Sequence, residues 1–391
     1  MPLIDEARLD GADRLAAADH RQMLRALATA GAQVREAVTL AQEAGIERVN
    51  GTDRPRAVVV AGLGGSAPVA DLLRVLSERS SPVPVSPCRT APLPGWVGAM
   101  DLVVAVSQSG RAAEPVALAQ EAARRGCGLL TVGAPGSPLA DACAAARGVH
   151  VPAPSGGPTT RTALWSLATP VLLAAGYLGM AAVDAEQLAA VADRLDEQAE
   201  ACRPSSETFV NPAKSLALDL AETVPVVLGD GDLMGVAARR AAAMISRTGR
   251  VPATSGQLPD AASDVVACLD GPYAAGGPGI DPTSGERDIF ADPFLDAPAQ
   301  PHLGLVVLRD AEPEPATAES TASFRLAQAV VDAAGEAGAR VRELTARPGT
   351  PLERIADQVA LTDFAATYLA LGLGLDPAVS GHVADLRERT A

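Results

Sequence analysis

Reactive side chains are scarce in this 391-residue sequence, which contains only five cysteines and four histidines. The cysteines are odd in number and lack CxxC spacing, so we expect neither a disulfide framework nor a cysteine zinc site. The histidines form no HxxxH or HExxH pair, which argues against a histidine metal site. We therefore expect a reduced, cytoplasmic chain without a bound metal.

Basic residues are also fewer than acidic ones in this sequence. The 32 Lys+Arg residues and 47 Asp+Glu residues give a formal net charge of −15. Nucleic acid and anionic membranes need a basic surface on the protein, so neither is an expected partner. Residues 1–30 show no secretory signal, and Pro170 and two glycines interrupt the most apolar stretch, 163–183. A small anionic ligand held by a local site is compatible with this balance.

Short apolar runs alternate with amphipathic stretches along the chain. The runs have the continuous apolar character of strands that are buried on both faces, and most are followed by a helical pattern. They lie at 57–61, 102–106, 128–133, 148–152, 224–233 (a strand with the Gly loop that follows it), 250–254, 303–309 and 339–344. Because buried strands alternate with helices, the sequence predicts an α/β fold with parallel, doubly wound sheets flanked by helices.

The same pattern predicts four segments. They are an N-terminal helical segment at 1–50, a first α/β domain at 51–155, connecting helices at 156–210, and a second α/β domain with C-terminal helices at 211–391. Residues 269–301 are rich in Gly, Pro and Asp, and we expect a long loop there.

Two loops rich in Gly and Ser follow predicted strands of the first domain. A glycine turn between a buried strand and a helix offers backbone N–H groups and the helix dipole to an anion, and serine hydroxyls can donate to phosphate oxygens. The carboxyl ends of neighbouring parallel strands meet at one edge of a sheet, so the loops are expected to converge on one phosphate. A single loop of this kind is often only structural. The candidate residues are Gly64, Gly65, Ser66, Ser107, Ser109 and Gly110.

The first loop, GLGGSA at 62–67, also fits a GxGxxA dinucleotide pattern. No acidic residue ends the next predicted strand, 81–88, where a ribose-binding carboxylate belongs. The sole lysine, Lys214, is not part of a GxxxxGK[ST] loop. Phosphate without a nucleotide is the preferred interpretation, and a nicotinamide-dependent oxidoreductase remains an alternative.

GLGGSA and SQSG resemble the phosphosugar loops of the sugar isomerase (SIS) domain, which have the patterns GxGGS and SxSGxTxE. Four blocks resemble, in order, parts of the bifunctional phosphoglucose/phosphomannose isomerase family: 211–221, 237–252, 258–264 and 368–377. The resemblance implies two SIS-type domains and a homodimer. It also implies interconversion of aldose and ketose 6-phosphates without a metal or other cofactor.

The resemblance assigns roles to individual residues. Gly65 and Ser66 match the first phosphate loop, and Ser107 and Ser109 match the second, whereas the family's threonine in that loop falls on Ala112. Arg161 matches an arginine that, in the family, faces the reacting carbons and stabilises the enediolate.

The positions that move protons in the family are altered here. Isomerisation needs a base, usually a carboxylate, and the family's base falls on Arg247, which stays protonated. The ring-opening histidine falls on Ser263, and a C-terminal lysine falls on Arg387. We therefore expect binding of a phosphosugar, a carbohydrate derivative, with weak or lost isomerase activity.

The alternative is an active isomerase of hexose 6-phosphates with relocated catalytic groups. The nearest substitutes in the sequence are Glu114, Asp260, Asp264 and His382. Each of these is also typical of a solvated surface group.

Overall fold

The computed structural model describes residues 4, 6–50, 54–77, 81–154, 159–274, 302–311 and 317–390. Residues 275–301, most of the predicted long loop, lie outside the described part of the chain.

The chain forms two compact units, each assembled from segments that are distant in the sequence. The first-sheet unit consists of Arg21–Glu200 and Pro351–Ala356. The second-sheet unit consists of Met1–His20, Ala201–Thr350 and Asp357–Ala391. The predicted boundaries at residues 50, 155 and 210 were drawn along the chain and stay a prediction.

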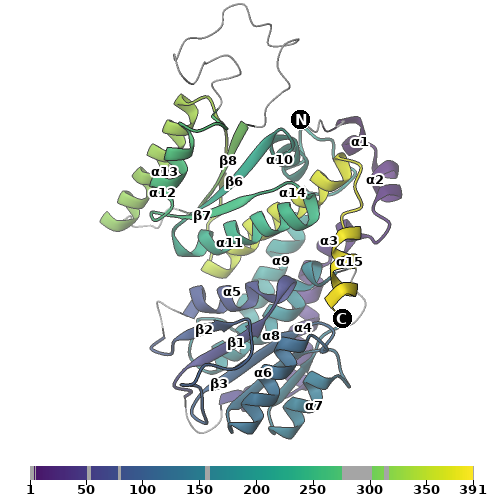
Figure 1. Cartoon of the computed structure of the whole chain (residues 1–391), viewed down its shortest axis with the longest axis vertical. Coiled ribbons are helices and arrows are strands. Elements are labelled where there is room, and N and C mark those ends of the chain that lie inside the picture. Colours follow the sequence, from purple (N-terminus) through teal and green to yellow (C-terminus); the bar gives the residue numbers. More distant parts are fainter. Residues whose placement is uncertain are drawn as a thin grey trace, which may run out of the picture. The chain divides into compact units, whose positions relative to one another are not determined.

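The first-sheet unit is built on a five-stranded parallel sheet (Figure 1). Its strands, in the spatial order β2-β1-β3-β4-β5, are β2 (Val85–Cys88), β1 (Val58–Gly62), β3 (Leu102–Ser107), β4 (Gly128–Gly133) and β5 (Val149–Pro152). Every residue of β1 and β3 is buried, which explains why these runs carry no polar alternation. The order of strands reverses between β1 and β3, and open α/β sheets bind their ligands at such a switch point.

Helices cover both faces of this sheet because right-handed crossovers leave a switch point in opposite directions. On one face, α6 (Ala113–Arg124) and α7 (Pro138–Ala145) pack their apolar residues against Val59, Val103 and Leu129. The helix after β1 is α5 (Pro68–Ser77), which contacts α8 (Leu164–Tyr177). The other helical segments of this unit are α3 (Met23–Ala28), α4 (Ala30–Glu43), η1 (Ile46–Asn50), η2 (Gly64–Ser66), η3 (Thr160–Ala163) and α9 (Ala185–Ala201).

The second-sheet unit has a four-stranded parallel sheet in the order β7-β6-β8-β9. The strands are β7 (Thr254–Leu258), β6 (Thr223–Asp230), β8 (His302–Arg309) and β9 (Arg340–Thr345). This order repeats that of the first four strands of the other sheet. β6 therefore takes the place of β1, β8 takes the place of β3, and a second switch point lies between β6 and β8.

The helices of the second-sheet unit include two that follow the central strand: α11 (Gly231–Met244) and the π-helical turn η4 (Ile245–Gly249). The remainder are α1 (Glu6–Asp10), α2 (Ala12–Ala18), α10 (Pro212–Ala221), α12 (Ala262–Cys268), α13 (Ala318–Glu336), α14 (Pro351–Gly372) and α15 (Gly381–Thr390). With two parallel sheets flanked by helices, the predicted α/β fold class is confirmed.

One strand lies later in the chain than its apolar pattern suggested. Residues 250–254 were expected to form a strand, but β7 begins only at Thr254. Arg250 has a φ of 59° at the end of the π-helical turn, and Pro252 has no N–H to donate to a sheet. The backbone therefore leaves the turn before it can join the sheet.

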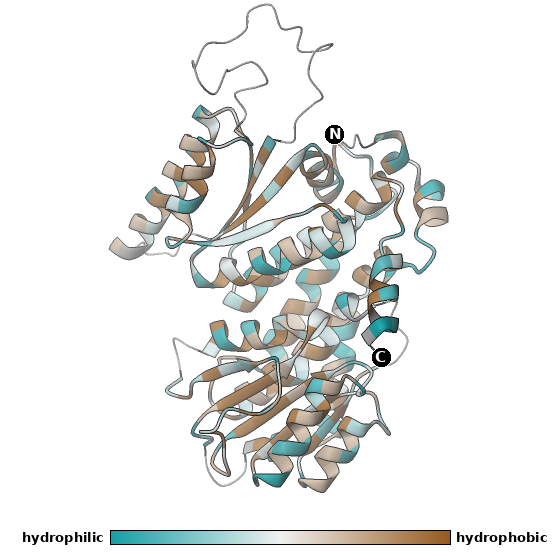
Figure 2. Cartoon of the chain, in the orientation of Figure 1, coloured by the Kyte–Doolittle hydropathy of each residue, from teal (hydrophilic) through white to brown (hydrophobic). Residues whose placement is uncertain are grey.

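The hydropathy of the residues matches the layers of sheet and helices. Strands of the first sheet are drawn in the hydrophobic colour in Figure 2, and α8 is buried along nearly its whole length.

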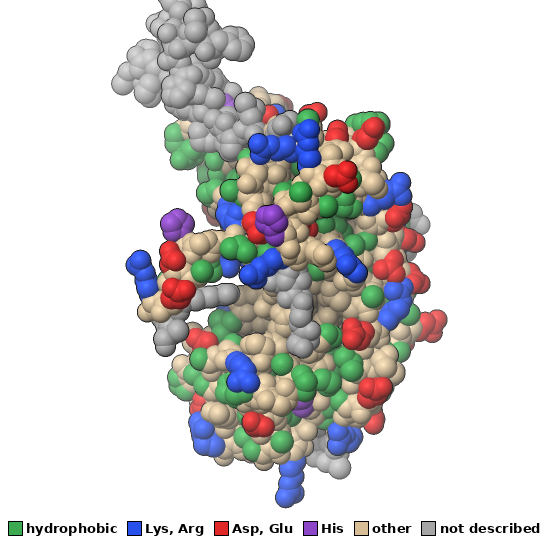
Figure 3. All heavy atoms as spheres, turned by 90° about the vertical axis from the view of Figure 1, so that its right-hand side faces the viewer, with side chains coloured by type: hydrophobic (Ala, Val, Ile, Leu, Met, Phe, Trp, Pro, Cys, Tyr) green, Lys and Arg blue, Asp and Glu red, His purple; other side chains and the backbone are tan. Residues whose placement is uncertain are grey.

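Within the described residues, none of the helices is both long and apolar enough to span a bilayer. Lys and Arg side chains stand among acidic ones on the face shown in Figure 3, without a continuous basic surface there.

Candidate functional site

The first Gly-rich loop leaves the carboxyl end of β1 and passes through η2 into α5. Gly64 has a φ of +56°, a left-handed conformation that glycine adopts without strain. The buried Ser66 hydroxyl donates to the Leu63 carbonyl at 2.9 Å and accepts from the Leu63 N–H at 3.0 Å. The same oxygen lies 3.3 Å from the Val106 carbonyl of β3. Ser66 therefore closes its own loop and ties it to the neighbouring strand.

Arg161 lies beside this loop. A Cβ atom at Gly65 would lie 2.8 Å from the carbonyl carbon of Thr160 and 3.0 Å from the backbone nitrogen of Arg161. Only glycine permits so close an approach of η3 to the loop. The turn is held from its other side by Gln33 of α4, whose Nε2 donates to the Thr162 carbonyl at 3.0 Å. The backbone of Arg161 is thus held in a fixed position beside the first loop.

The second loop leaves the carboxyl end of β3 and enters α6. The hydroxyl of the buried Ser107 accepts from the Ala112 N–H at 3.4 Å, and that of the exposed Ser109 accepts from the Arg111 N–H at 3.3 Å. Gly110 has a φ of +63°, and a Cβ there would overlap the Ser137 hydroxyl. This loop is consequently locked against the N-terminus of α7.

Ala112 is the N-cap residue of α6, and no side-chain hydrogen bond caps this helix. The position that resembles a threonine in the SIS pattern is therefore the position from which a hydroxyl would cap the helix. Without that hydroxyl, the first N–H groups of α6 have no side-chain acceptor from the cap residue, and the positive end of the helix dipole faces the loop.

The two loops share one edge of the first sheet. Gly62 of β1 pairs with Val106 of β3, so the chain leaves both strands side by side at the switch point. The structure therefore brings together both predicted loops and Arg161: Gly64, Gly65, Ser66, Ser107, Ser109, Gly110 and Arg161.

The corresponding edge of the second sheet carries charged side chains instead. Arg309 ends β8, is 4% exposed, and donates to Glu343 of β9 at 2.7 Å. Its Nε atom lies 3.7 Å from Asp230, which ends β6 and accepts from the Ser323 hydroxyl at 2.6 Å. The Arg309 guanidinium also lies 4.4 Å from the ring centre of Phe324.

The Arg309 guanidinium at the second switch point is thus engaged by two carboxylates of its own unit. Sequence reasoning missed this network, although acidic residues within the GDGD run at 229–232, directly after a predicted strand, were a visible signal.

Arg247 and Ser263, where the resemblance predicts altered proton-transfer groups, flank one strand of the second sheet. Arg247 lies in η4, which precedes β7, and Ser263 lies in α12, which follows it. The five-residue strand between these two elements spans roughly 16 Å. Ser263 is exposed, and Arg247 is half-buried.

The remaining candidates are peripheral. Arg387 lies in α15, and its side chain is outside the described part of the structure. The possible substitutes, Glu114, Asp260, Asp264 and His382, are all exposed. In the described ranges, no three His, Cys, Asp or Glu side chains are grouped in a way that could hold a metal ion.

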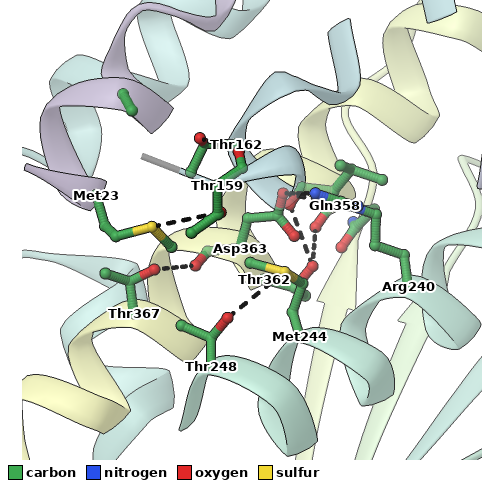
Figure 4. A network of polar contacts seen from close by, with 12 residues as sticks. Met23, Thr159, Thr162, Arg240, Met244, Thr248, Gln358, Thr362, Asp363 and Thr367 are labelled. Carbon is green, nitrogen blue, oxygen red and sulfur yellow. Dashed lines mark hydrogen bonds and ion pairs between the residues drawn. The ribbon is translucent and has the colours of Figure 1, made fainter. Parts of the chain in front are cut away.

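Two buried charged groups in the second-sheet unit hold the fold together. The Lys214 Nζ atom donates to the carbonyls of Pro204 and Ser206 at 2.8 and 2.6 Å, and burial lowers the pKa of this lysine. Arg240 of α11 donates to Asp363 of α14 at 2.7 Å, and both side chains are at most 5% exposed (Figure 4). Both groups are satisfied inside the protein, which favours a structural role.

Residues 209–390 match the family described as the bacterial phosphoglucose isomerase C-terminal SIS domain. This match covers just under half of the chain. A bifunctional phosphoglucose/phosphomannose isomerase from Caldicellulosiruptor bescii is 30% identical over 196 residues, which cover 50% of this chain and 57% of that protein. The chain therefore matches little more than half the length of this curated relative. The predicted resemblance to SIS isomerases is confirmed.

Solved structures support the fold of the whole chain. A hypothetical protein from Thermus thermophilus has a TM-score of 0.63 at 16% identity, with 97% of this chain and 93% of that chain covered. The C-terminal domain of a glucosamine-fructose-6-phosphate aminotransferase from Francisella tularensis has a TM-score of 0.60 at 13% identity, with 91% and 97% covered. At such identities the likeness concerns the fold alone, and the shared fold is an α/β fold with two parallel sheets flanked by helices.

Proposed function

We propose that this SIS protein binds a sugar phosphate at the switch point of its first sheet, and that its isomerase activity is weak or lost. The observation that carries the proposal is the convergence of the 64–66 loop, the 107–110 loop and Arg161 at one edge of one sheet. This is the position at which open α/β sheets bind their ligands.

The groups at this edge are suited to bind an anionic phosphate group that is attached to a polar sugar. Backbone N–H groups of the two loops and the positive end of α6 would hold the phosphate, because they offer donors and a favourable dipole without a fixed negative charge. Arg161 would face the oxygens of the sugar, where its planar fork can donate two parallel hydrogen bonds. Such an arrangement binds and orients but does not move a proton.

The proton-transfer groups support the second half of the proposal. Arg247 stays protonated at neutral pH and cannot act as a base. Ser263 stands where the resemblance places the ring-opening histidine, and a hydroxyl of ordinary acidity cannot replace an imidazole as an acid or base near pH 7. General acid–base groups contribute about 10²–10⁴-fold to a rate, so we expect turnover below ordinary enzyme values by about that factor.

Binding is tested by titration calorimetry with fructose 6-phosphate and with unphosphorylated fructose. We expect heat of binding with the phosphate ester and none with the neutral sugar. Arg161→Gln should weaken binding by about tenfold. Arg147→Gln is the matched control, because this exposed arginine follows α7 and precedes β5 at the other edge of the same sheet. If wild-type protein binds neither phosphate ester nor phosphate, the proposal is wrong.

Activity is tested separately with coupled assays that interconvert glucose, mannose and fructose 6-phosphates. Incorporation of solvent deuterium at C2 detects proton transfer even when net turnover is slow. Ordinary enzyme rates, about 1–10³ per second, would contradict the expected loss of activity and favour an isomerase with relocated catalytic groups.

The assembly and location of the chain are also proposed here. We infer a cytoplasmic homodimer, because the resemblance implies a dimer and all five cysteines are free thiols in the structure. Light scattering of the purified chain at several concentrations tests the dimer. We expect sugar phosphate binding to require no nicotinamide or other cofactor.

A further inference from the structure

We propose that Arg111 is an additional phosphate-binding residue that makes the first switch point selective for a dianionic phosphate. The proposal rests on the proposed function of this site and names the charge of the ligand that it recognises. In the SIS pattern SxSGxTxE, Arg111 stands at the variable position between the glycine and the threonine.

The backbone of Arg111 is held firmly in the loop. It follows Gly110, whose positive φ and contact with Ser137 exclude any side chain, and it precedes Ala112, the N-cap of α6. Its own N–H donates to the Ser109 hydroxyl at 3.3 Å. The Cα atom of Arg111 is therefore fixed at the positive end of α6, between the serine loop and the first helical turn.

The side chain of Arg111 is exposed, and it makes no hydrogen bond or ion pair with the described residues. Two other arginines of the unit differ. Arg125, after the other end of α6, donates to Glu121 at 2.5 Å, and Arg89, which follows β2 at the same edge as the loops, lies 3.8 Å from Asp71. Arg111 is thus a cation at the candidate site that has no ion-pair partner among the described residues.

The charges of the loops explain why such a cation matters. The 62–67 loop carries no charged residue, and the 107–114 segment carries only Arg111 and Glu114. Glu114 lies in the first turn of α6, where its negative charge opposes an anionic ligand. A phosphate ester carries about −1.5 to −2 charges near pH 7. Without Arg111 the second loop would present a net negative charge to this ester.

Two further features point the same way. The chain as a whole has a net charge of −15, so its long-range field repels anions and recognition depends on local cations. Ala112 lacks the hydroxyl that the SIS pattern places beside the phosphate, which removes one neutral donor. A guanidinium can replace this donor with two charge-assisted hydrogen bonds.

The test compares Arg111→Gln with Arg124→Gln in the full chain. Arg124 is the matched control, because it is also an exposed arginine of the same segment but lies in the last turn of α6. Both variants remove one positive charge, so a purely long-range effect would weaken binding equally in both. Calorimetry with fructose 6-phosphate and with inorganic phosphate measures the dissociation constants, and melting temperatures check that each variant is folded.

We expect Arg111→Gln to raise the dissociation constant of fructose 6-phosphate about tenfold, and Arg124→Gln to change it less than about twofold. The ratio for Arg111→Gln should be larger at about pH 7.5 than at about pH 5.5, because the second ionisation of phosphate has a pKa near 6. Arg111→Lys should retain part of the affinity, since it keeps the charge but not the fork.

Equal affinities of wild type and Arg111→Gln would overturn this proposal while leaving phosphosugar binding intact. Equal losses in the two Gln variants would also overturn it, because they would reflect only the net charge. A ratio that does not depend on pH would refute selectivity for the dianion. Absence of binding by wild-type protein would overturn both this proposal and the proposed function.

Discussion

Replacing Gly65 with alanine tests whether the first loop and Arg161 act as one structure. The new Cβ would lie 2.8 Å from the Thr160 carbonyl carbon, 2.9 Å from the Thr160 Cβ and 3.0 Å from the Arg161 nitrogen. Two of these three neighbours are backbone atoms, which cannot rotate away. The loop or η3 must therefore shift by several tenths of an ångström, because about 0.6 Å is needed to bring the shortest of these contacts to an ordinary separation.

The expected loss of stability depends on how firmly the loop and η3 are held in place. Ser66 ties the loop to β3, and Gln33 ties η3 to α4, so neither side can move freely. Overpacking of a well-packed site costs about 1–3 kcal/mol, and we expect the free energy of unfolding to fall by about 2 kcal/mol. Displacement of Arg161 should also weaken fructose 6-phosphate binding by about tenfold, which corresponds to about 1.4 kcal/mol.

Substitutions at two other glycines serve as controls, because they add the same methyl group without the close contact to η3. Gly64 has a φ of +56° but no atom within 4 Å of its Cβ position, so Gly64→Ala measures left-handed strain alone, about 1–2 kcal/mol. Gly98 also has open space at its Cβ position but has no positive φ, so Gly98→Ala should be nearly neutral.

Urea unfolding and calorimetry provide the measurements. If Gly65→Ala unfolds like Gly98→Ala and binds fructose 6-phosphate like wild type, the close approach of η3 to the loop is refuted.

Three further predictions concern other parts of the molecule. Ala112→Thr should supply the missing N-cap hydroxyl of α6, raise the free energy of unfolding by about 1 kcal/mol, and tighten fructose 6-phosphate binding in calorimetry. Asp363→Ala should lower the free energy of unfolding in urea by about 3–5 kcal/mol, because it leaves the charge of the buried Arg240 without this carboxylate; a mild effect would contradict the role assigned to the pair. Burial lowers the pKa of His150 from 6.5, so the folded protein binds this proton less readily than the unfolded chain, and stability present above about pH 6.5 should be lost as the pH falls toward the folded pKa. His150→Gln should flatten this part of the stability profile in urea titrations between about pH 5 and 7.5, and an unchanged slope would exclude the histidine as its source.

Much of the fold was predictable from local pattern. Continuous apolar runs such as 57–61 and 102–106 became β1 and β3, because a strand covered on both faces has no polar side to show in its sequence. The start of β7 was not predictable in this way. It depends on the left-handed Arg250 and the π-helical turn before it, and neither has a periodic signal.

The candidate site was predictable only in part. The glycines and serines of the two loops predict strand–helix turns at one edge of the sheet. In the structure, both loops lie at that edge. The direction of the Ser66 hydroxyl toward its own backbone was not predictable, because it depends on the distance to Leu63 and Val106 after folding. That the Arg111 side chain has no ion-pair partner among the described residues was likewise not predictable, since it depends on which carboxylates come within ion-pair distance after folding.

By itself, the sequence determined the α/β class and the two Gly-rich loops. These features are local, so periodicity and residue type reveal them. The resemblance to SIS isomerases adds the prediction that Arg247 and Ser263 stand where that family has proton-transferring side chains. The tertiary structure decided that the backbone of Arg161 lies against Gly65 and that Arg309 pairs with Asp230 and Glu343 at the second switch point. These are distances between residues far apart in the chain, and only the crossover connections and the packing of the folded units set them.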